Sequence, residues 1–254
     1  MNKTIIGLAD KTPHLNPEKP GFLLIDDGPI ADIFLQRFKR AKEFKPRSHS
    51  FNPLPMDYRK AREFAAIVYG EQGQTTLTAR NGKRALTRLL MTADRLDKLK
   101  AGKSDEEKEA VAIIDDLLIS PLLRSILCKP TSFSFRAGNP PSSIIARLDR
   151  PDIGEHDARI LGALLISQFK GQIIVPDFGF YARSFHTSLV REGRLIAGVY
   201  TLSELDEKLR HQCLLHETIP LQCTWDDAQT LARYEGLVPS TVGYGDYVSA
   251  AMSP

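Results

Sequence analysis

The sequence contains little cysteine and no long apolar segment. Its three cysteines, Cys128, Cys213 and Cys223, show no CxxC spacing and cannot pair evenly, which excludes a zinc knuckle and a disulfide framework. This usage is typical of a reducing compartment. The longest apolar run, 160–166, falls far short of the roughly 20 residues of a spanning helix, and residues 1–10 lack the apolar core of a signal peptide. We therefore expect a soluble, cytoplasmic protein without a membrane span.

Motifs for a zinc enzyme and for a serine nucleophile are also missing. The six histidines show neither HExxH nor another metal-ligand spacing, since the closest two, His211 and His216, lie five residues apart. Ser184, Ser188 and Ser203 lack a GxSxG elbow. The sequence therefore supports neither a zinc site nor a hydrolase triad.

The chain has 254 residues, 42% hydrophobic and 26% charged, which is enough for a full core. Its formal net charge is only +3, but residues 37–103 hold 17 Lys or Arg against 6 Asp or Glu, a balance of +11 that leaves −8 elsewhere. Two interpretations fit this basic region. It is either a surface for nucleic-acid phosphates, with Arg80, Lys83, Arg84 and Arg88 as candidates, or a set of solvated helix faces.

Strand and helix patterns alternate along most of the chain. Short apolar runs predict strands at 22–25, 143–148, 173–175, 195–199 and 219–223, and an extended piece at 48–54. Helical spacing predicts helices at 30–38, 57–69, 154–170, 182–193, 204–216 and 225–235. Such alternation is typical of a mainly parallel sheet with helices on both faces.

The stretch at about 80–128 interrupts this alternation, because its pattern is helical and strand signals are almost absent. Ser104 and Glu107 form a capping box inside it. We therefore expect an all-helical insertion within an α/β domain that covers residues 21–236. Residues 1–20 are expected to form an extended N-terminal arm, and residues 237–254 a C-terminal tail.

The turn after the first predicted strand is where an open parallel sheet is expected to bind a ligand. A phosphate loop needs GxxxxGK[ST], whereas this turn holds Asp26, Asp27, Gly28 and Asp32 with neither lysine nor hydroxyl. Mutual repulsion of the carboxylates and a phosphate argues against a nucleotide in the usual pose. The turn is either a plain Asp-Asp-Gly-Pro turn, followed by a helix from Pro29, or a magnesium site at Asp26 and Asp27.

Two other positions can be compared with P-loop chemistry. Gly82 and Lys83 fail the phosphate-loop pattern and are typical of a helix start with a basic first turn. Asp177 follows an apolar run, as does the magnesium-binding aspartate of P-loop enzymes, but Phe178 stands where a glutamate often polarises water. Asp177 either holds a metal ion or caps the following segment.

Six short segments then occur in a recognisable order. They are SFNPL at 50–54, SPLLRSIL at 120–127, GEHDARILG at 154–162, REGR at 191–194, LSEL at 202–205 and DAQTLA at 227–232. In order and spacing they resemble the FtsK–HerA P-loop ATPases, in the branch of conjugative-transfer and coupling proteins. The resemblance spans roughly residues 21–236.

This resemblance implies a RecA-like core with a helical insertion, often assembled as a hexameric ring that moves DNA or protein with ATP. It places Walker A at residues 26–32 and matches the Walker B aspartate with Asp177. Phe178 stands at the position of its partner glutamate, and Tyr200 at that of the family's strand-end glutamine. Because phosphoryl transfer depends on positioning and charge stabilisation, loss of lysine and glutamate predicts little turnover.

We therefore expect a catalytically degenerate ATPase-like protein without a cofactor. It would act as a binding or regulatory subunit of a phage or mobile-element DNA-handling machine. Its expected partners are another protein, further copies of the same chain in a homo-oligomeric ring, or nucleic acid bound at residues 37–103. The alternative is an active ATP-dependent translocase that uses ATP and magnesium. In that case Lys39, Arg183 or a lysine of a neighbouring subunit replaces the missing lysine.

Overall fold

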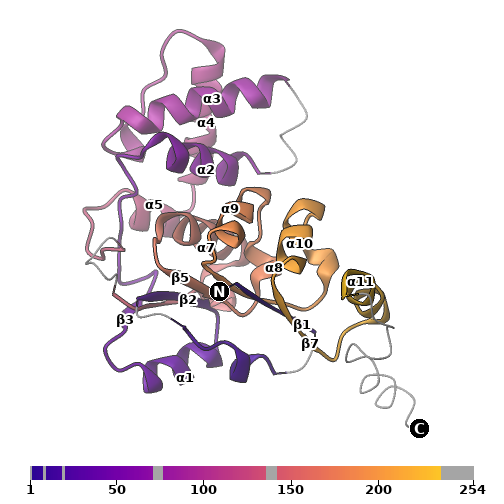
Figure 1. The fold of residues 1–254 in the computed structure, drawn as a ribbon. Helices are drawn as coiled ribbons and strands as arrows, with labels where there is room; N and C mark the ends of the chain where they lie inside the picture. Colours follow the sequence, from indigo (N-terminus) through magenta and orange to yellow (C-terminus); the bar gives the residue numbers. More distant parts are fainter. Residues whose placement is uncertain (1, 8–9, 19–20, 71–76, 136–141, 236–254) are drawn as a thin grey trace. The chain divides into compact units, whose positions relative to one another are not determined.

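The computed structural model describes residues 2–7, 10–18, 21–70, 77–135 and 142–235 (Figure 1). It divides into two compact units. Unit 1 comprises Met1–Asp26 and Gly171–Pro254, and unit 2 comprises Asp27–Lys170. Within the described residues, no helix is sufficiently long and apolar to cross a membrane.

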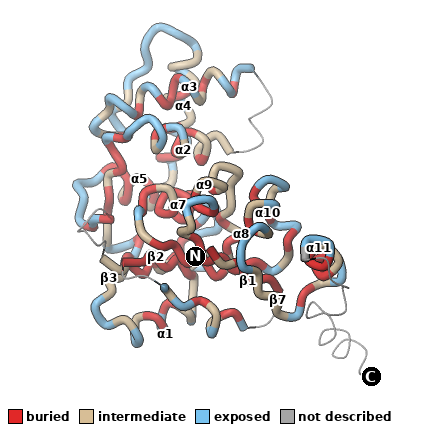
Figure 2. The backbone as a smooth tube through the Cα atoms, in the orientation of Figure 1, coloured by how far each residue is buried: buried red, intermediate tan, exposed pale blue. Residues whose placement is uncertain are grey.

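Unit 1 is built on five parallel strands. These are β1 (Lys3–Gly7), β2 (Phe22–Asp26), β5 (Gln172–Val175), β6 (Leu195–Val199) and β7 (Glu217–Leu221), paired in the order β2-β5-β6-β1-β7. Every residue of β2, β5 and β6 is buried, as Figure 2 shows for β2, which explains their continuous apolar sequences. The α-helices described in this unit are α8 (Phe178–Tyr181), α9 (Thr187–Arg191), α10 (Glu207–Leu214) and α11 (Trp225–Glu235).

Unit 2 pairs β3 (Lys42–Phe44) in parallel with β4 (Ile144–Arg147). Its helices are α1 (Pro29–Arg37), α2 (Tyr58–Tyr69), α3 (Leu77–Thr92), α4 (Asp105–Leu117), α5 (Pro121–Leu127), α6 (Arg150–Ile153) and α7 (Glu155–Gln168). Figure 1 shows α1 on one side of β3, and α5 and α7 on the other. Ser104 caps α4 by accepting a hydrogen bond from the Glu107 backbone N–H at 3.2 Å, which is the serine half of the predicted capping box.

Each described strand pairing, in unit 1 as in unit 2, is parallel. The predicted class, a mainly parallel α/β fold, is therefore confirmed.

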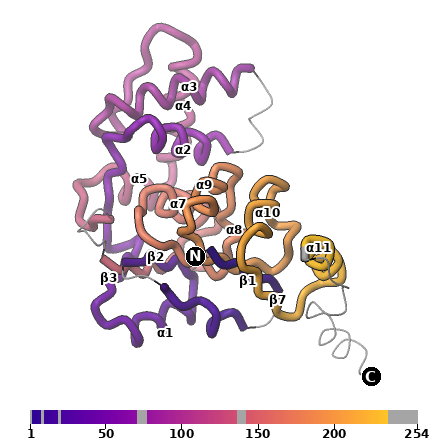
Figure 3. The backbone as a smooth tube through the Cα atoms, in the orientation of Figure 1, coloured from indigo at the N-terminus to yellow at the C-terminus, as the bar shows by residue number. Residues whose placement is uncertain are grey.

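The prediction of an extended arm over residues 1–20 is wrong for residues 3–7. These residues form β1, which pairs with β6 on one side and β7 on the other. Figure 3 shows this strand from the start of the chain beside β7 from near its end. The Asn2 side chain extends the pairing, since its Oδ1 accepts a hydrogen bond from the Leu195 N–H at 3.0 Å. A run of only three apolar or β-branched residues gives too weak a local signal for this long-range pairing.

Two further boundaries differ from the sequence prediction. The extended piece predicted at 48–54 is not a strand of the sheet, and the strand of this region is β3, at Lys42–Phe44. The helical region begins with α2 rather than near residue 80, because α2 packs against both α3 and α4. The predicted tail at 237–254 lies outside the described residues.

His186 gives unit 1 an expected pH dependence. It is 1% exposed, and its Nδ1 accepts a hydrogen bond from the Arg183 N–H at 3.1 Å. Burial, with a contribution from the Arg183 charge, lowers the pKa of His186 from 6.5 to about 3. The unfolded chain therefore takes up a proton near pH 6.5 that the folded chain does not bind, and stability falls as the pH drops from 6.5 towards 3. We expect a loss of roughly 2 kcal/mol between pH 7 and pH 5.

Urea unfolding at the two pH values measures this loss. The His186→Asn variant is the comparison, because its side-chain oxygen offers a similar acceptor but does not titrate. We expect the variant to lose about 2 kcal/mol less than the wild type on acidification. Equal losses in the two proteins would show that His186 is not responsible.

Candidate functional site

The turn between β2 and α1 carries the predicted acidic residues. β2 ends at Asp26, which is 6% exposed, and Gly28 is the N-cap residue of α1. Pro29 is the first helical residue, as the sequence predicts. A β-carbon placed on Gly28 would meet no atom within 4 Å. The neighbouring backbone therefore does not require a glycine here, and a larger side chain would find space.

Two arginines neutralise carboxylates of this turn. The guanidinium of Arg150 is ion-paired with Asp27, and that of Arg147 with Asp32. Arg147 also donates a hydrogen bond to Glu43 at 3.2 Å. The hydrogen bond from Arg147 is the main cause that lowers the pKa of Asp32 below its usual value. Arg147 ends β4 and Arg150 begins α6, so one short stretch of chain supplies both cations.

This pairing changes the electrostatic prediction for the turn. The sequence predicts repulsion by bare carboxylates, whereas Asp27 and Asp32 each contact a guanidinium in the structure. A phosphate at the turn would have to compete with these carboxylates for the arginines, and such charge-assisted hydrogen bonds are strong. Two of the three carboxylates of the turn are therefore paired with arginines, and these cations already hold acidic partners.

The predicted magnesium positions lie at this turn and at Asp177. In the part of the chain that the structure describes, no three His, Cys, Asp or Glu side chains gather as a possible metal site. A magnesium ion bound at Asp26 and Asp27, or at Asp177, would depend on water or on substrate oxygens for most of its coordination.

A second group of polar side chains lies in unit 1, at the carboxyl ends of three parallel strands. Asp177 follows β5, Tyr200 follows β6, and Lys11 lies four residues after β1. Carboxyl ends of parallel strands share one edge of a sheet, which is where open α/β sheets bind ligands. Glu204, which ends the short 3-10 helix Leu202–Glu204, belongs to the same group. We call these four residues the strand-end cluster.

Lys11 is the cation of the strand-end cluster. It is only 6% exposed, and its Nζ lies 3.8 Å from the centroid of the Tyr200 ring, a cation–π contact. Burial lowers the pKa of Lys11, and the negative charges of Asp177 and Glu204 oppose this shift. Gly198 makes room for the lysine, because a β-carbon there would lie 2.8 Å from Lys11 Cδ and 2.1 Å from the carbonyl oxygen of Pro176.

The two acidic residues of the cluster differ in their surroundings. The Glu204 carboxylate accepts a hydrogen bond from the Tyr200 N–H at 3.2 Å, and burial raises its pKa. Asp177 is the N-cap residue of α8, but its side chain makes no capping hydrogen bond. Asp177 thus occupies the N-cap position of α8, but its side chain does not cap the helix as one of the two predicted alternatives requires.

Sequence reasoning misses Lys11 and Glu204. Lys11 lies in the stretch interpreted as an arm, and only the short run Thr4–Ile6 before Gly7 could have indicated a strand ending near it. The two cations considered as substitutes for the missing lysine are placed differently. Lys39 lies in an exposed turn after α1, and the Arg183 guanidinium donates a hydrogen bond to the Ala182 carbonyl at 2.6 Å.

The predicted basic candidates lie on α3. Arg80, Arg84 and Arg88 are exposed and follow one another at intervals of four, so they share one face of the helix. Lys83 is partly buried and donates a hydrogen bond to the Gly70 carbonyl at 3.3 Å. Three of the four candidates thus form an exposed basic face, which we call the α3 arginine face, and Lys83 lies off it.

Comparison with solved structures shows that the fold is of the RecA-like P-loop NTPase class. More particularly, the chain is similar to the plasmid coupling protein TrwB in complex with the ATP analogue ADPNP, with a TM-score of 0.61 at 11% identity, over 96% of this chain and 80% of that chain. It is also similar to VirB4 of Thermoanaerobacter pseudethanolicus, with a TM-score of 0.55 at 11% identity, over 94% of this chain and 82% of that chain.

A further TrwB structure, the trigonal form in complex with sulphate, matches with a TM-score of 0.59 at 12% identity, over 96% of this chain and 80% of that chain. No protein-family model matches the sequence, and no curated protein matches it significantly. At these identities the similarity establishes the fold. The fold implied by the resemblance to FtsK–HerA ATPases is therefore confirmed.

Proposed function

We propose that this chain is a catalytically degenerate ATPase-like protein that serves as a binding or regulatory subunit of a phage or mobile-element DNA-handling machine. The observation that carries this proposal is the turn at the start of α1. There Asp27 and Asp32 are bound by Arg150 and Arg147, at the place where a P-loop offers backbone N–H groups and a lysine to phosphates. The fold shared with the coupling protein TrwB supports the DNA-handling context.

The Walker B position supports the same conclusion. Asp177 follows β5 as a magnesium-binding aspartate would, but the next residue is Phe178, whose side chain is fully buried. A buried phenyl ring can neither polarise nor position an attacking water. Positioning and charge stabilisation supply nearly all of phosphoryl-transfer catalysis, so loss of the lysine and the glutamate together leaves little to accelerate the reaction.

The ATP test of this proposal uses the purified full chain with Mg–ATP. We expect no binding at micromolar concentrations and no phosphate release above a protein-free blank. The Asp177→Ala variant should give the same result as the wild type, because there is no activity to remove. Micromolar binding together with magnesium-dependent turnover that disappears in Asp177→Ala would refute the proposal.

The strand-end cluster favours a second candidate function, an active ATPase with an unconventional phosphate site. Lys11 is buried beside Asp177 and Glu204 at the ligand-binding edge of the sheet, and a buried cation there could contact phosphate oxygens. The Lys11→Met variant tests it, since methionine keeps most of the apolar stem and removes the charge. Turnover in the wild type that is lost in folded Lys11→Met would favour this candidate.

A neighbouring subunit could instead supply the lysine, which requires an assembled ring. Light scattering on the purified chain shows whether it forms the oligomer that a lysine from a neighbouring subunit requires. A monomer at tens of micromolar that still hydrolyses ATP would exclude a lysine contributed by another subunit and require a cation of the same chain.

A further inference from the structure

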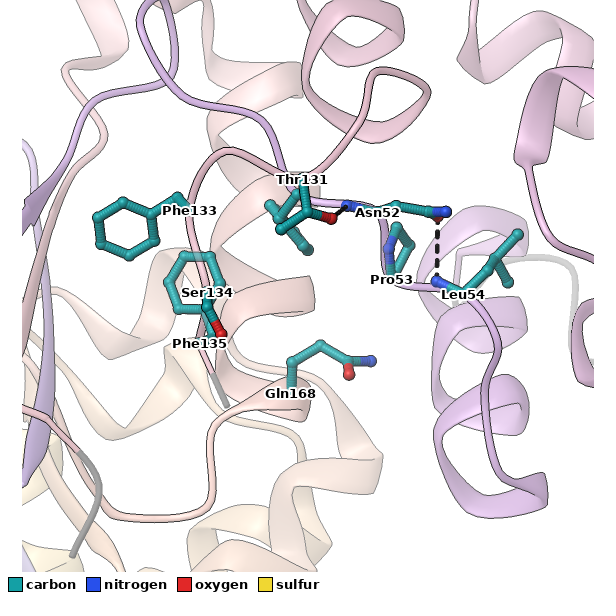
Figure 4. Close-up of a pocket in the computed structure, with 9 residues that line it drawn as sticks. Asn52, Pro53, Leu54, Thr131, Phe133, Ser134, Phe135 and Gln168 are labelled. Carbon is teal, nitrogen blue, oxygen red and sulfur yellow. Dashed lines mark hydrogen bonds between the residues drawn. The ribbon is translucent and has the colours of Figure 1, made fainter. Parts of the chain in front are cut away.

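Unit 2 contains a cavity whose lining includes no residue of the acidic turn or of the α3 arginine face. Its volume is about 220 Å³, and it is lined by two segments, 51–54 and 131–135, together with Gln168 at the end of α7. Figure 4 shows Gln168 reaching into the space between these two segments. The volume corresponds to roughly seven water molecules at about 30 Å³ each, which suits a single small ring system rather than a whole nucleotide.

Three of the nine lining residues are phenylalanines, and their rings pack against one another. Phe51 and Phe135 meet edge to face with ring centroids 5.1 Å apart, and Phe133 lies 5.0 Å from Phe135. Behind them the fully buried ring of Phe44 contacts all three, with centroid distances from 5.2 to 6.0 Å. Rings packed in this way form a preformed surface against which a flat ligand can pack.

Hydrogen bonds join the two lining segments. The Ser50 carbonyl accepts bonds from the N–H groups of Ser132 and Phe133, both at 3.0 Å, and the Asn52 N–H donates to Thr131 Oγ1 at 2.9 Å. These contacts connect positions about eighty residues apart in the chain. The cavity is therefore built into the folded unit and does not depend on a single flexible loop.

One polar group in the cavity lacks a partner. Gln168 is 6% exposed, and its side-chain nitrogen is buried without a hydrogen bond. The nearby amide of Asn52 is already used, because it donates to the Asp94 carbonyl at 2.7 Å and accepts from the Leu54 N–H at 3.1 Å. Buried donors in folded proteins are nearly always paired, so the Gln168 amide requires an acceptor that a bound molecule can supply.

The lining also restricts the charge of that molecule. None of the described lining residues is ionisable, so a phosphate or another ion would lose its hydration without gaining a counter-charge. A neutral ring with a polar edge meets all these conditions, since its faces pack on phenyl rings and its edge accepts a hydrogen bond from an amide. Glutamine and asparagine side chains bind base edges in this way.

The geometry points to a binding site for one neutral nucleobase, packed against Phe51, Phe133 and Phe135 and hydrogen-bonded at its edge by Gln168. The base belongs either to a free nucleoside or to a nucleotide of a single strand whose backbone stays outside. This site is independent of the proposed function, because it uses neither the acidic turn nor the strand-end cluster.

The first experiment titrates the full chain with adenosine and with thymidine in a calorimeter. We expect at least one nucleoside to bind, and the Gln168→Leu variant to bind it at least tenfold more weakly. The exposed Gln36 of α1 provides the matched control, and Gln36→Leu should bind as the wild type does. Absence of binding of both nucleosides at millimolar concentration, together with no base-dependent binding of a single strand, overturns the proposal.

Two further measurements complete the test. One checks that the Gln168→Leu variant is folded, and the other distinguishes a free nucleoside from a base of a single strand. Gln168→Leu removes an unpaired buried donor, so its urea midpoint should be at least that of the wild type, and a lower affinity then reports the site. An eight-nucleotide single strand is compared with the same strand made abasic. If the intact strand binds more tightly than the abasic strand, and Gln168→Leu loses this difference, the bound base belongs to a nucleic acid. If the two strands bind equally while a nucleoside binds, the ligand is a free nucleoside. Binding of every probe unchanged in Gln168→Leu overturns the site.

Discussion

Replacing Gly7 by alanine is expected to destabilise the protein by more than about 4 kcal/mol, a large part of the roughly 5–15 kcal/mol that stabilises an ordinary folded protein. Gly7 ends β1 with a φ of +131°, a conformation that residues with a side chain rarely adopt. A β-carbon at this position would lie 1.6 Å from the carbonyl oxygen of Leu221, the residue with which Gly7 pairs in β7. Gly7 is buried and the clash is with a backbone carbonyl that belongs to the β1–β7 pairing, so relieving it would disturb that pairing.

Urea unfolding followed by circular dichroism measures this effect, and Gly28→Ala is the matched control. Gly28 has an extended φ of −166°, and a β-carbon on it meets no atom within 4 Å. Its replacement should cost less than about 1 kcal/mol, the scale of an unfavourable N-cap residue. Unfolding of Gly7→Ala and Gly28→Ala at the same urea concentration would contradict the close approach of β1 and β7.

Charge reversal of the α3 arginine face is expected to weaken DNA binding at least a hundredfold. If Arg80, Arg84 and Arg88 contact phosphates, each contact releases a counterion from the DNA. Their replacement by glutamate removes these three contacts and adds three negative charges that the phosphates repel. The slope of log affinity against log salt should also fall by about 3. Fluorescence anisotropy with a 20-base-pair duplex of arbitrary sequence, at several salt concentrations, measures both quantities.

The control for this experiment reverses three exposed cations elsewhere in unit 2, Lys129, Arg159 and Lys170. Each triple variant changes the formal net charge from +3 to −3, so a general effect of charge acts equally on both. We expect the control to bind within a few-fold of the wild type. If the two variants lose affinity and salt dependence to the same extent, α3 is not the interface, and its arginines are solvated helix residues.

The core strands and many helices of this protein could be predicted from the sequence because their signals are local. β2, β5 and β6 are buried throughout and therefore appear as continuous apolar runs. α11 has the predicted bounds, Trp225–Glu235, since its amphipathic spacing is complete within eleven residues. The resemblance in the order of short motifs likewise sufficed for the fold, which TrwB and VirB4 share.

The candidate sites could be predicted only in part. Asp177, Asp27 and Gly28 could be located because each directly follows an apolar run or precedes a helix. Their partners could not, since no local pattern indicates which distant charge will face them. Arg150 is 123 positions from Asp27, and the proximity of Lys11 to Asp177 depends on the insertion of β1 between β6 and β7.

The sequence by itself thus determined the parallel α/β class, the acidic and lysine-free turn at residues 26–32, and the basic character of residues 37–103. Only the tertiary structure decided that arginines balance Asp27 and Asp32, that Lys11 is buried beside Asp177, and that Gln168 faces an aromatic cavity. The physical reason is the separation along the chain of the residues involved. Burial of a strand and the periodicity of a helix can be recognised from neighbouring residues, whereas ion pairs and cavities form where packing brings together segments far apart in the chain.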